Sequence, residues 1–119
     1  MKNFRDLKVW EKAHRFTLEI YNVTKKFPGE EKFGLISQIR RASLSIPSNI
    51  AEGCGRDGGA EFARFLTIAL GSASEAEYQL LLAKDLGFLE TASWNRLNDQ
   101  IIEIKRMTTG LLKSIRNKK

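Results

Sequence analysis

Apolar residues recur every three or four positions along four separate stretches of the chain, which is the spacing of a helix that buries one face. We call each such row of positions a seam. The first two seams are Val9, Ala13, Phe16, Ile20, Val23 and Phe27, and then Ile36, Ile39, Ser43, Ile46, Ile50 and Gly53. The third and fourth are Phe62, Leu66, Ala69, Ala73, Ala76, Leu80 and Ala83, and then Trp94, Leu97, Ile101, Ile104, Thr108, Leu111 and Ile115. No stretch alternates with the period of two that a half-buried strand requires, so the pattern predicts four helices and no sheet.

Short breaks separate the four stretches. Pro28 and Gly29 follow the first seam, a glycine-rich run occupies residues 53–59, and Gly87 follows the third seam. Proline and glycine both continue a helix poorly, so the helices should end at these breaks. We therefore predict an all-α fold in which residues 1–119 form a single domain. This domain is an antiparallel up-down-up-down four-helix bundle with helices at roughly 7–27, 32–53, 59–86 and 92–116.

The third predicted helix is apolar nearly all round, whereas the outer faces of the first and fourth are polar. Its positions outside the seam include Phe65, Ile68, Leu70, Tyr78, Leu81 and Leu82. Such a helix must be buried on more than one side, and a lone four-helix bundle offers it no second partner. We therefore expect self-association through the second and third helices. The candidate contact residues are Arg41, Ser45, Pro47, Ser48, Glu52, Arg64, Ile68, Gly71, Glu75, Tyr78 and Leu82.

Pro47 conflicts with the helical pattern that surrounds it. A proline inside a helix removes a backbone donor and costs about 3 kcal/mol, yet the second seam passes through this position without a break. We expect a local bend there and a free carbonyl at Ser43, which a hydroxyl group or water would satisfy. Because Pro47 lies between Ser45 and Ser48, we place it on the surface that meets a neighbouring protomer.

The chain is basic, with a formal net charge of +6, but the charge is unevenly distributed. Residues 61–90 carry two basic and five acidic side chains, whereas residues 91–119 carry seven basic and two acidic ones. Excess positive charge at the two ends of the chain indicates a polyanionic partner, with RNA or DNA first. A merely solvated helical face is the alternative for any single residue. The candidate nucleic-acid contacts are Lys8, Lys12, Arg15, Lys26, Lys105, Arg106, Lys113 and Arg116.

Several chemical classes are disfavoured. A single cysteine, Cys54, allows neither an intramolecular disulfide nor a cysteine zinc site, and a single histidine, His14, does not supply a bundle di-iron site. The run GCGRDG matches a dinucleotide fingerprint but follows a helix rather than a strand. We therefore expect no cofactor, no metal and no catalytic residues, and predict that the protein is not an enzyme. No apolar run spans a membrane and no leader is evident, so we expect a cytoplasmic protein.

Three segments in order resemble a known family. They are FRDLKVW at residues 4–10, QIRRA leading into SIPSNIAEG at residues 38–53, and EFARFLTIALGS at residues 61–72, followed by Glu75. They resemble the bacterial 23S rRNA intervening-sequence protein family, also called the four-helix bundle protein family. The resemblance implies a small helical bundle that forms a ring-like homo-oligomer, a homopentamer. A related branch, the accessory proteins of diversity-generating retroelements, implies binding to nucleic acid and to a reverse transcriptase.

Two functional hypotheses remain open from the sequence. The leading one is a non-enzymatic oligomeric bundle that binds RNA or other nucleic acid through phosphate contacts. The other is a protein-interaction scaffold whose positive charge provides solubility or docks an acidic protein surface.

Overall fold

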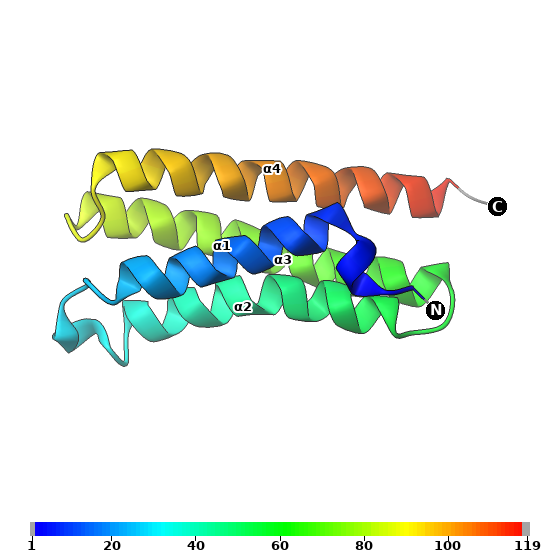
Figure 1. The fold of residues 1–119 in the computed structure, drawn as a ribbon, viewed down its shortest axis with the longest axis horizontal. Helices are drawn as coiled ribbons and strands as arrows, with labels where there is room; N and C mark the ends of the chain where they lie inside the picture. The colour runs from blue at the N-terminus through cyan, green and yellow to red at the C-terminus, as the bar shows by residue number, and fades with distance from the viewer. Residues whose placement is uncertain (1, 118–119) are drawn as a thin grey trace.

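Four α helices make up the fold in the computed structural model, which describes residues 2–117 (Figure 1). They are α1 (Lys8–Thr24), α2 (Leu35–Cys54), α3 (Gly59–Asp85) and α4 (Thr91–Arg116). Two short 3₁₀ turns, η1 (Phe4–Asp6) and η2 (Gly29–Glu31), precede α1 and α2. No strand occurs within residues 2–117, which confirms the predicted all-α class with four helices.

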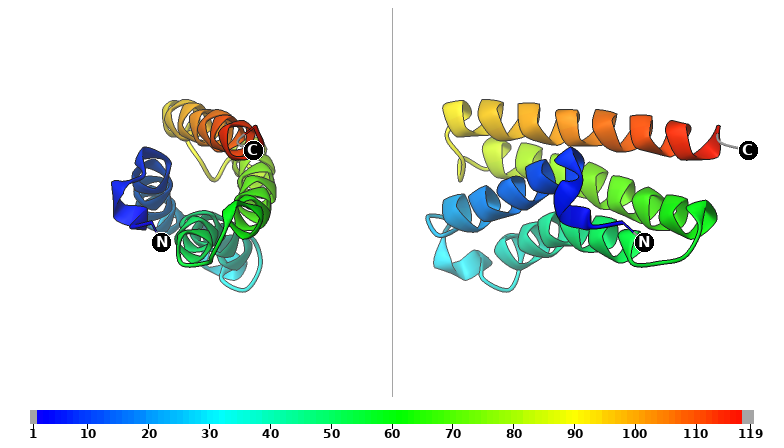
Figure 2. Two further views of the ribbon diagram at one scale, coloured as in Figure 1. Left: turned by 90° about the vertical axis from the view of Figure 1, so that its right-hand side faces the viewer. Right: turned by 45° about the vertical axis from the view of Figure 1, so that its right-hand side comes forward.

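Each helix packs against the next one along the chain, and α1 also packs against α4. The end-on view in Figure 2 shows the four helices around a common axis, with α1 diagonally opposite α3 and α2 diagonally opposite α4. The described residues extend over 49 × 23 × 20 Å, because α3 alone, with 27 residues, is about 40 Å long. The result is a narrow rod with long lateral surfaces and two small ends.

The four seams form the core. All seven positions of the third seam are buried, and so are the seam residues of α1 apart from half-buried Val23. The fourth seam shifts near its end, where Leu112 is buried and Leu111 is half-buried. Leu112 comes four residues after Thr108 and Leu111 only three, so the straight helix brings Leu112 closer to the axis at this point.

The connection between α1 and α2 is longer than the sequence pattern predicts. Helix α1 ends at Thr24 rather than near residue 27, and α2 begins at Leu35 rather than near residue 32. Pro28 disfavours a helical backbone in the residue before it, which ends the helix early. Phe27 is nevertheless buried and packs against Phe88, with the ring centroids 5.7 Å apart.

Helices α2 and α3 approach closely where the glycine-rich run begins. A Cβ atom on Gly53 would lie 3.0 Å from both the Phe62 ring and Cβ of Phe65, so this position has no space for a side chain. Gly58 precedes α3 with φ of 87°, a backbone conformation that glycine adopts readily. The run therefore allows close helix packing and then a tight turn.

Pro47 lies inside α2, and α1 compensates for the backbone hydrogen bond that it removes. The Ser43 carbonyl would normally accept from the amide of residue 47. Here its donor is Thr17 Oγ1 of α1, which lies 2.9 Å from it and also 2.9 Å from the Ala13 carbonyl, so the one hydroxyl hydrogen is shared between the two acceptors. Pro47 itself is buried and lines the contact with α1 beside Trp10 and His14. The predicted hydroxyl partner of Ser43 is therefore present. Pro47 is thus buried within the single chain, while it also lines the groove between α1 and α2. Its placement on a surface that meets another protomer stays a prediction.

Candidate nucleic-acid and self-association surfaces

The candidate cations on α1 differ in their surroundings. Lys12 forms an ion pair with Glu103 of α4 at 3.1 Å, and Arg15 lies 3.9 Å from Glu11 in the preceding turn. Lys8 and Lys26 are exposed and have no carboxylate within 4 Å among residues 2–117. Lys12 therefore helps to join α1 to α4, whereas Lys8 and Lys26 remain free to meet an external anion.

The candidate cations on α4 divide in the same way. Lys105 donates to Glu77 of α3 at 2.7 Å, and Arg116 donates to Thr67 of α3 at 3.5 Å. Arg106 and Lys113 are exposed, and no carboxylate of the described residues lies within 4 Å of either. Arg106 and Lys113 are thus the outward cations of α4, while Lys105 and Arg116 face α3.

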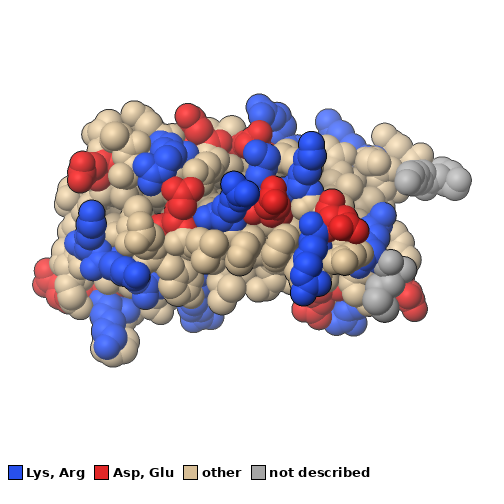
Figure 3. All heavy atoms as spheres, in the orientation of Figure 1, with Lys and Arg blue, Asp and Glu red and all other residues tan. Residues whose placement is uncertain are grey.

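Polar side chains join α1 to α4. Glu19 accepts hydrogen bonds from Arg96 at 2.9 Å and from Gln100 at 2.7 Å. Together with the Lys12–Glu103 pair, these contacts place acidic groups between the basic ones along this surface. Figure 3 shows the result: basic and acidic side chains alternate over the middle of the face that α1 and α4 present. No broad single-sign patch covers the middle of that face.

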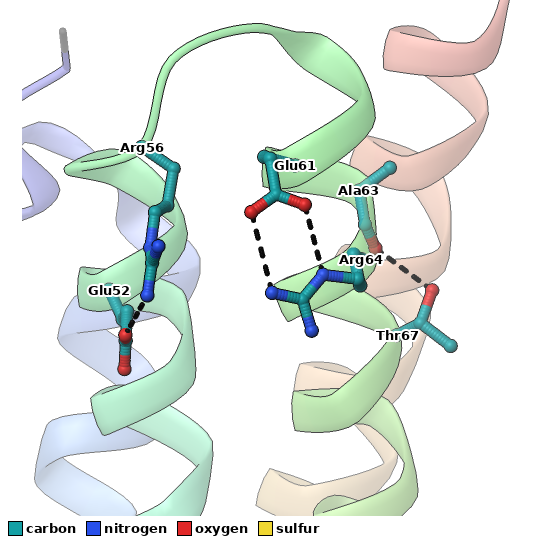
Figure 4. Close-up of polar contacts among 6 residues, drawn as sticks. All are labelled: Glu52, Arg56, Glu61, Ala63, Arg64 and Thr67. Carbon is teal, nitrogen blue, oxygen red and sulfur yellow. Dashed lines mark hydrogen bonds and ion pairs between the residues drawn. The ribbon is translucent and has the colours of Figure 1, made fainter.

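Two ion pairs lie where α2 leads into α3 (Figure 4). Arg56 donates to Glu52 at 2.7 Å, and Arg64 donates to both carboxylate oxygens of Glu61, at 3.0 and 3.3 Å. The hydrogen bond from Arg64 lowers the pKa of Glu61 and raises that of Arg64. The guanidinium groups of Arg56 and Arg64 also lie over the Phe65 ring, 5.0 and 4.4 Å from its centroid, so Phe65 is buried without a second protomer.

The other candidate self-association residues lie on the outer surfaces of α2 and α3. Ser45 is half-buried and shares a 2.7 Å hydrogen bond with Ser72 across the two helices, and Leu82 is also half-buried. Glu75 and Tyr78 are exposed, and the Tyr78 side chain is 60% exposed. The remaining exposed candidates are Arg41, Ser48, Glu52, Arg64, Ile68 and Gly71. Pro47 is the one candidate that the fold buries.

Two grooves, one between α3 and α4 and one between α1 and α2, carry some of the exposed apolar side chains. These two helix pairs lie on opposite sides of the bundle (Figure 2). The α3–α4 groove has a volume of about 400 Å³ and is lined by Ser74, Glu77, Tyr78, Leu81, Trp94 and Asn98. The α1–α2 groove, of about 250 Å³, is lined by Phe4, Trp10, His14, Leu44, Pro47, Ser48 and Ala51. Leu18, exposed by 57%, lies one turn after His14 on the same face of α1. The exposed apolar area is thus split between unlike surfaces.

A third pocket, of about 420 Å³, lies at the end of the bundle that holds the α2–α3 connection, and includes Lys2, Cys54, Phe62 and Ile115 in its lining. Cys54 is buried, and this burial raises the pKa of its thiol, so the thiolate is disfavoured. His14 stacks on Trp10 with a centroid separation of 5.0 Å.

Within residues 2–117, no three His, Cys, Asp or Glu side chains come together in a way that could hold a metal ion. None of the helices in this described part has the length and hydropathy needed to cross a lipid bilayer.

Comparison with known proteins adds the family. A family model described as 23S rRNA-intervening sequence protein matches residues 5–110, which covers the four helices up to the last turns of α4. The chain belongs to this family. Comparison with curated proteins gives no match.

A solved structure agrees with this assignment. The chain is similar to the crystal structure of a protein of unknown function from the S23 ribosomal protein family of Bacteroides thetaiotaomicron VPI-5482. The two share 31% sequence identity with a TM-score of 0.82, over 88% of this chain and 98% of the other. This member of the 23S rRNA-intervening sequence protein family therefore has the same fold as a protein whose function is itself unknown.

The sequence reasoning missed one group of residues. Lys25, Lys32 and Arg40 lie near the α1–α2 connection and have no carboxylate within 4 Å among the described residues. Phe33 in the same connection is 89% exposed. Residues 25–33 contain three lysines and two phenylalanines, but also two glutamates, and Phe33 lies outside the seams that the prediction uses.

Proposed function

We propose that this protein is a non-enzymatic, self-associating helical bundle that binds RNA or other nucleic acid through phosphate contacts. The observation that carries the proposal is the set of outward cations without an acidic partner: Lys8 and Lys26 on the α1 side, and Arg106 and Lys113 on α4. Unpaired cations spread over a long surface suit a chain of phosphates better than a single small anion.

The same proposal includes a ring. Short connections between packed neighbours support an antiparallel up-down-up-down order of the helices. The two unlike grooves support head-to-tail contact, in which the α1–α2 groove of one protomer meets the α3–α4 groove of the next. Such contacts between different surfaces form closed rings when the rotation between copies closes.

Three points remain predictions from the resemblance. They are a ring of five protomers, a relation to retroelement accessory proteins, and a reverse transcriptase as partner. A ring repeats the same weak phosphate contacts around its circumference. Repetition converts weak contacts into tight binding without any base-specific contact.

The test is the salt dependence of binding by the full chain. Fluorescence anisotropy with a labelled structured RNA at about 50 mM and about 200 mM salt should show a steep loss of affinity, because each phosphate contact releases counterions. Equal binding at both concentrations, or no binding at the lower one, would contradict the proposal.

A charge-reversed variant sharpens the test. Replacing Lys8, Lys26, Arg106 and Lys113 with glutamate should weaken binding and reduce the salt slope, while light scattering shows the wild-type oligomeric state. A protein partner recovered in fixed stoichiometry after nuclease treatment, with no RNA binding, would favour the scaffold hypothesis instead.

A further inference from the structure

An exposed aromatic ring lies among cations at the end of the bundle where α1 connects to α2. We call this region the tip and define it as Tyr21, Lys25, Lys32, Phe33 and Arg40. Phe33 is 89% exposed, more than any other large hydrophobic side chain of residues 2–117. Lys32 Nζ lies 5.6 Å from the centroid of its ring. An aromatic ring so fully in water is available to an external planar group.

Arg40 is fixed in place by neutral groups only. Its Nε donates to Thr24 Oγ1 at 2.8 Å and its Nη2 donates to the Tyr21 carbonyl at 3.3 Å. The guanidinium also lies over the Tyr21 ring, 4.7 Å from the centroid. Arg40 is half-buried, and no carboxylate of the described residues lies within 4 Å of it. Its positive charge is therefore held in one orientation and is not neutralised.

Neither acid of the α1–α2 connection, Glu30 or Glu31, forms an ion pair within the described residues. Glu31 is used locally, since its Oε1 accepts a hydrogen bond from the Leu35 backbone amide at the start of α2, at 3.1 Å. Neither Lys25 nor Lys32 has an ion-pair partner among residues 2–117. Figure 3 shows several basic side chains, with fewer acidic ones, at the end of the face that carries this connection. The tip is thus a local concentration of free positive charge.

We propose that the tip binds a single-stranded or unpaired stretch of nucleic acid, with a base stacked on Phe33 and phosphates contacted by Lys25, Lys32 and Arg40. This inference rests on the proposed nucleic-acid function and gives it a location and a class of target. Aromatic stacking beside a basic surface is the general means by which proteins hold unpaired strands, because every base has a flat face. Arg40 lies about 8 Å along α2 from its first residue, Leu35, and Phe33 comes two residues before that start, so one ligand of a few nucleotides reaches both.

The composition of the tip favours this ligand over a membrane or an apolar protein surface. Apart from Phe33, the exposed part of the α1–α2 connection consists of Lys25, Lys26, Gly29, Glu30, Lys32 and Gly34. A membrane-binding surface would bury several apolar side chains together. A fixed arginine without a carboxylate suits a phosphate, which accepts two hydrogen bonds from its planar fork.

The first test removes the aromatic ring. Fluorescence anisotropy at about 50 mM salt would compare the full chain and Phe33→Ala on a labelled single-stranded RNA of about 12 nucleotides and on its duplex. Phe33→Ala should weaken single-strand binding about 5-fold to 100-fold and leave duplex binding within about twofold. Phe33→Trp should bind like the wild type. Ile102→Ala, which removes an exposed apolar side chain of α4 outside both grooves, serves as the control.

The second test removes the charge. Lys25→Gln with Lys32→Gln should weaken single-strand binding more than Arg106→Gln with Lys113→Gln, which removes the same charge from α4. An equal effect of the two double variants, or an unchanged affinity in Phe33→Ala, would overturn the assignment of the tip while leaving nucleic-acid binding in place. Absence of binding to any RNA by the wild type would instead remove the proposed function itself.

A membrane role is separated by one more measurement. Vesicles containing phosphatidylserine should not sediment the wild-type chain in a Phe33-dependent manner. Phe33-dependent sedimentation, or a changed oligomeric state of Phe33→Ala in light scattering, would overturn the proposal in favour of a lipid surface or a protomer contact. Since Phe33 is 89% exposed, Phe33→Ala should keep the wild-type melting temperature.

Discussion

The Thr17 hydroxyl makes the internal proline of α2 tolerable. Without it, the Ser43 carbonyl would be a buried acceptor lacking the amide that any other residue would supply at position 47. A buried polar group without a partner costs about 1–3 kcal/mol. The hydrogen bond joins α1 to α2, so the proline that interrupts the hydrogen bonding of α2 is accompanied by a specific contact between the two helices.

A double-mutant cycle tests this pairing. Thr17→Val should lower the free energy of unfolding by about 1–3 kcal/mol, because it leaves the buried Ser43 carbonyl without this donor. Adding Pro47→Ala to Thr17→Val should recover part of the loss, since the new amide can donate to the same carbonyl. Urea denaturation of the four proteins measures the coupling. Thr67→Val is the control, because the Thr67 hydroxyl is exposed and donates only within its own helix. A Thr17→Val effect no larger than that of Thr67→Val would refute the role of Thr17.

The two hydrogen bonds from the Arg64 guanidinium to the Glu61 carboxylate lead to a prediction about the pH dependence of stability. The pKa of Glu61 is lowered in the folded chain, chiefly by the hydrogen bond from Arg64. A lowered carboxyl pKa adds stability that is present above the unfolded pKa and is lost as pH falls through the folded pKa. Arg64→Gln should raise the Glu61 pKa towards its ordinary value in an NMR titration. Arg64→Lys should give an intermediate value, because it keeps the charge and loses the fork. An unchanged pKa in Arg64→Gln would show that another group causes the shift.

At the scale of the helices, the distance between α2 and α3 depends on Gly53. Gly53→Ala should destabilise the fold by about 1–3 kcal/mol, because the added methyl group must displace Phe62 or Phe65. Gly110→Ala is the matched control: its Cβ would meet nothing within 4 Å inside α4. It should gain about 0.5–1 kcal/mol from reduced backbone freedom alone. Urea denaturation compares the two, and a stabilising effect of both would contradict the close packing inferred here.

The seams predict the helices and most of the core, because burial on one face follows directly from spacing along a single helix. They do not predict contacts made between helices. The sequence shows that Pro47 interrupts a hydrogen bond, but Thr17 is 30 positions away, so the covering helix could not be known from the pattern. Likewise, Lys12 and Lys8 look alike in the sequence, and only the packing of α1 on α4 brings Glu103 to Lys12 and leaves Lys8 unpaired.

The connections between helices are the parts of the fold that the pattern predicts least well, because they too depend on contacts between helices. The pattern extends α1 to residue 27 because Phe27 is apolar and correctly spaced, whereas the helix ends at Thr24 and Phe27 is buried from the connection instead. Phe33 contributes to no seam, so its exposure follows from the path of the chain between α1 and α2 and not from periodicity.

For the whole molecule, the two unlike grooves make a specific prediction about assembly. Tyr78→Ser with Leu81→Ser removes apolar contacts from the α3–α4 groove, and Leu18→Ser with Leu44→Ser removes them from the α1–α2 groove. Each double variant alone should be monomeric in light scattering, because each ring contact uses one surface of each kind. An equimolar mixture should form a heterodimer through the one junction that remains intact.

Other outcomes of the mixing experiment are informative. Phe33→Ala should assemble like the wild type and serves as the control for removing an exposed apolar side chain. A single self-complementary contact between α2 and α3 would give no heterodimer on mixing, and a monomeric wild type at micromolar concentration would contradict the ring itself.

The location of the tip has a consequence for such a ring. The tip and the end of the bundle where Lys2 bonds to the Cys54 carbonyl lie at opposite ends of the rod (Figure 1). In a cyclic ring whose rods lie side by side along the axis, all rods point the same way, so one rim would present every Phe33 and the other every Lys2–Cys54 contact. The two rims of the assembly would therefore differ, with a circle of exposed aromatic rings on one rim only. A long unpaired strand bound at that rim of several assemblies would orient them all in the same direction.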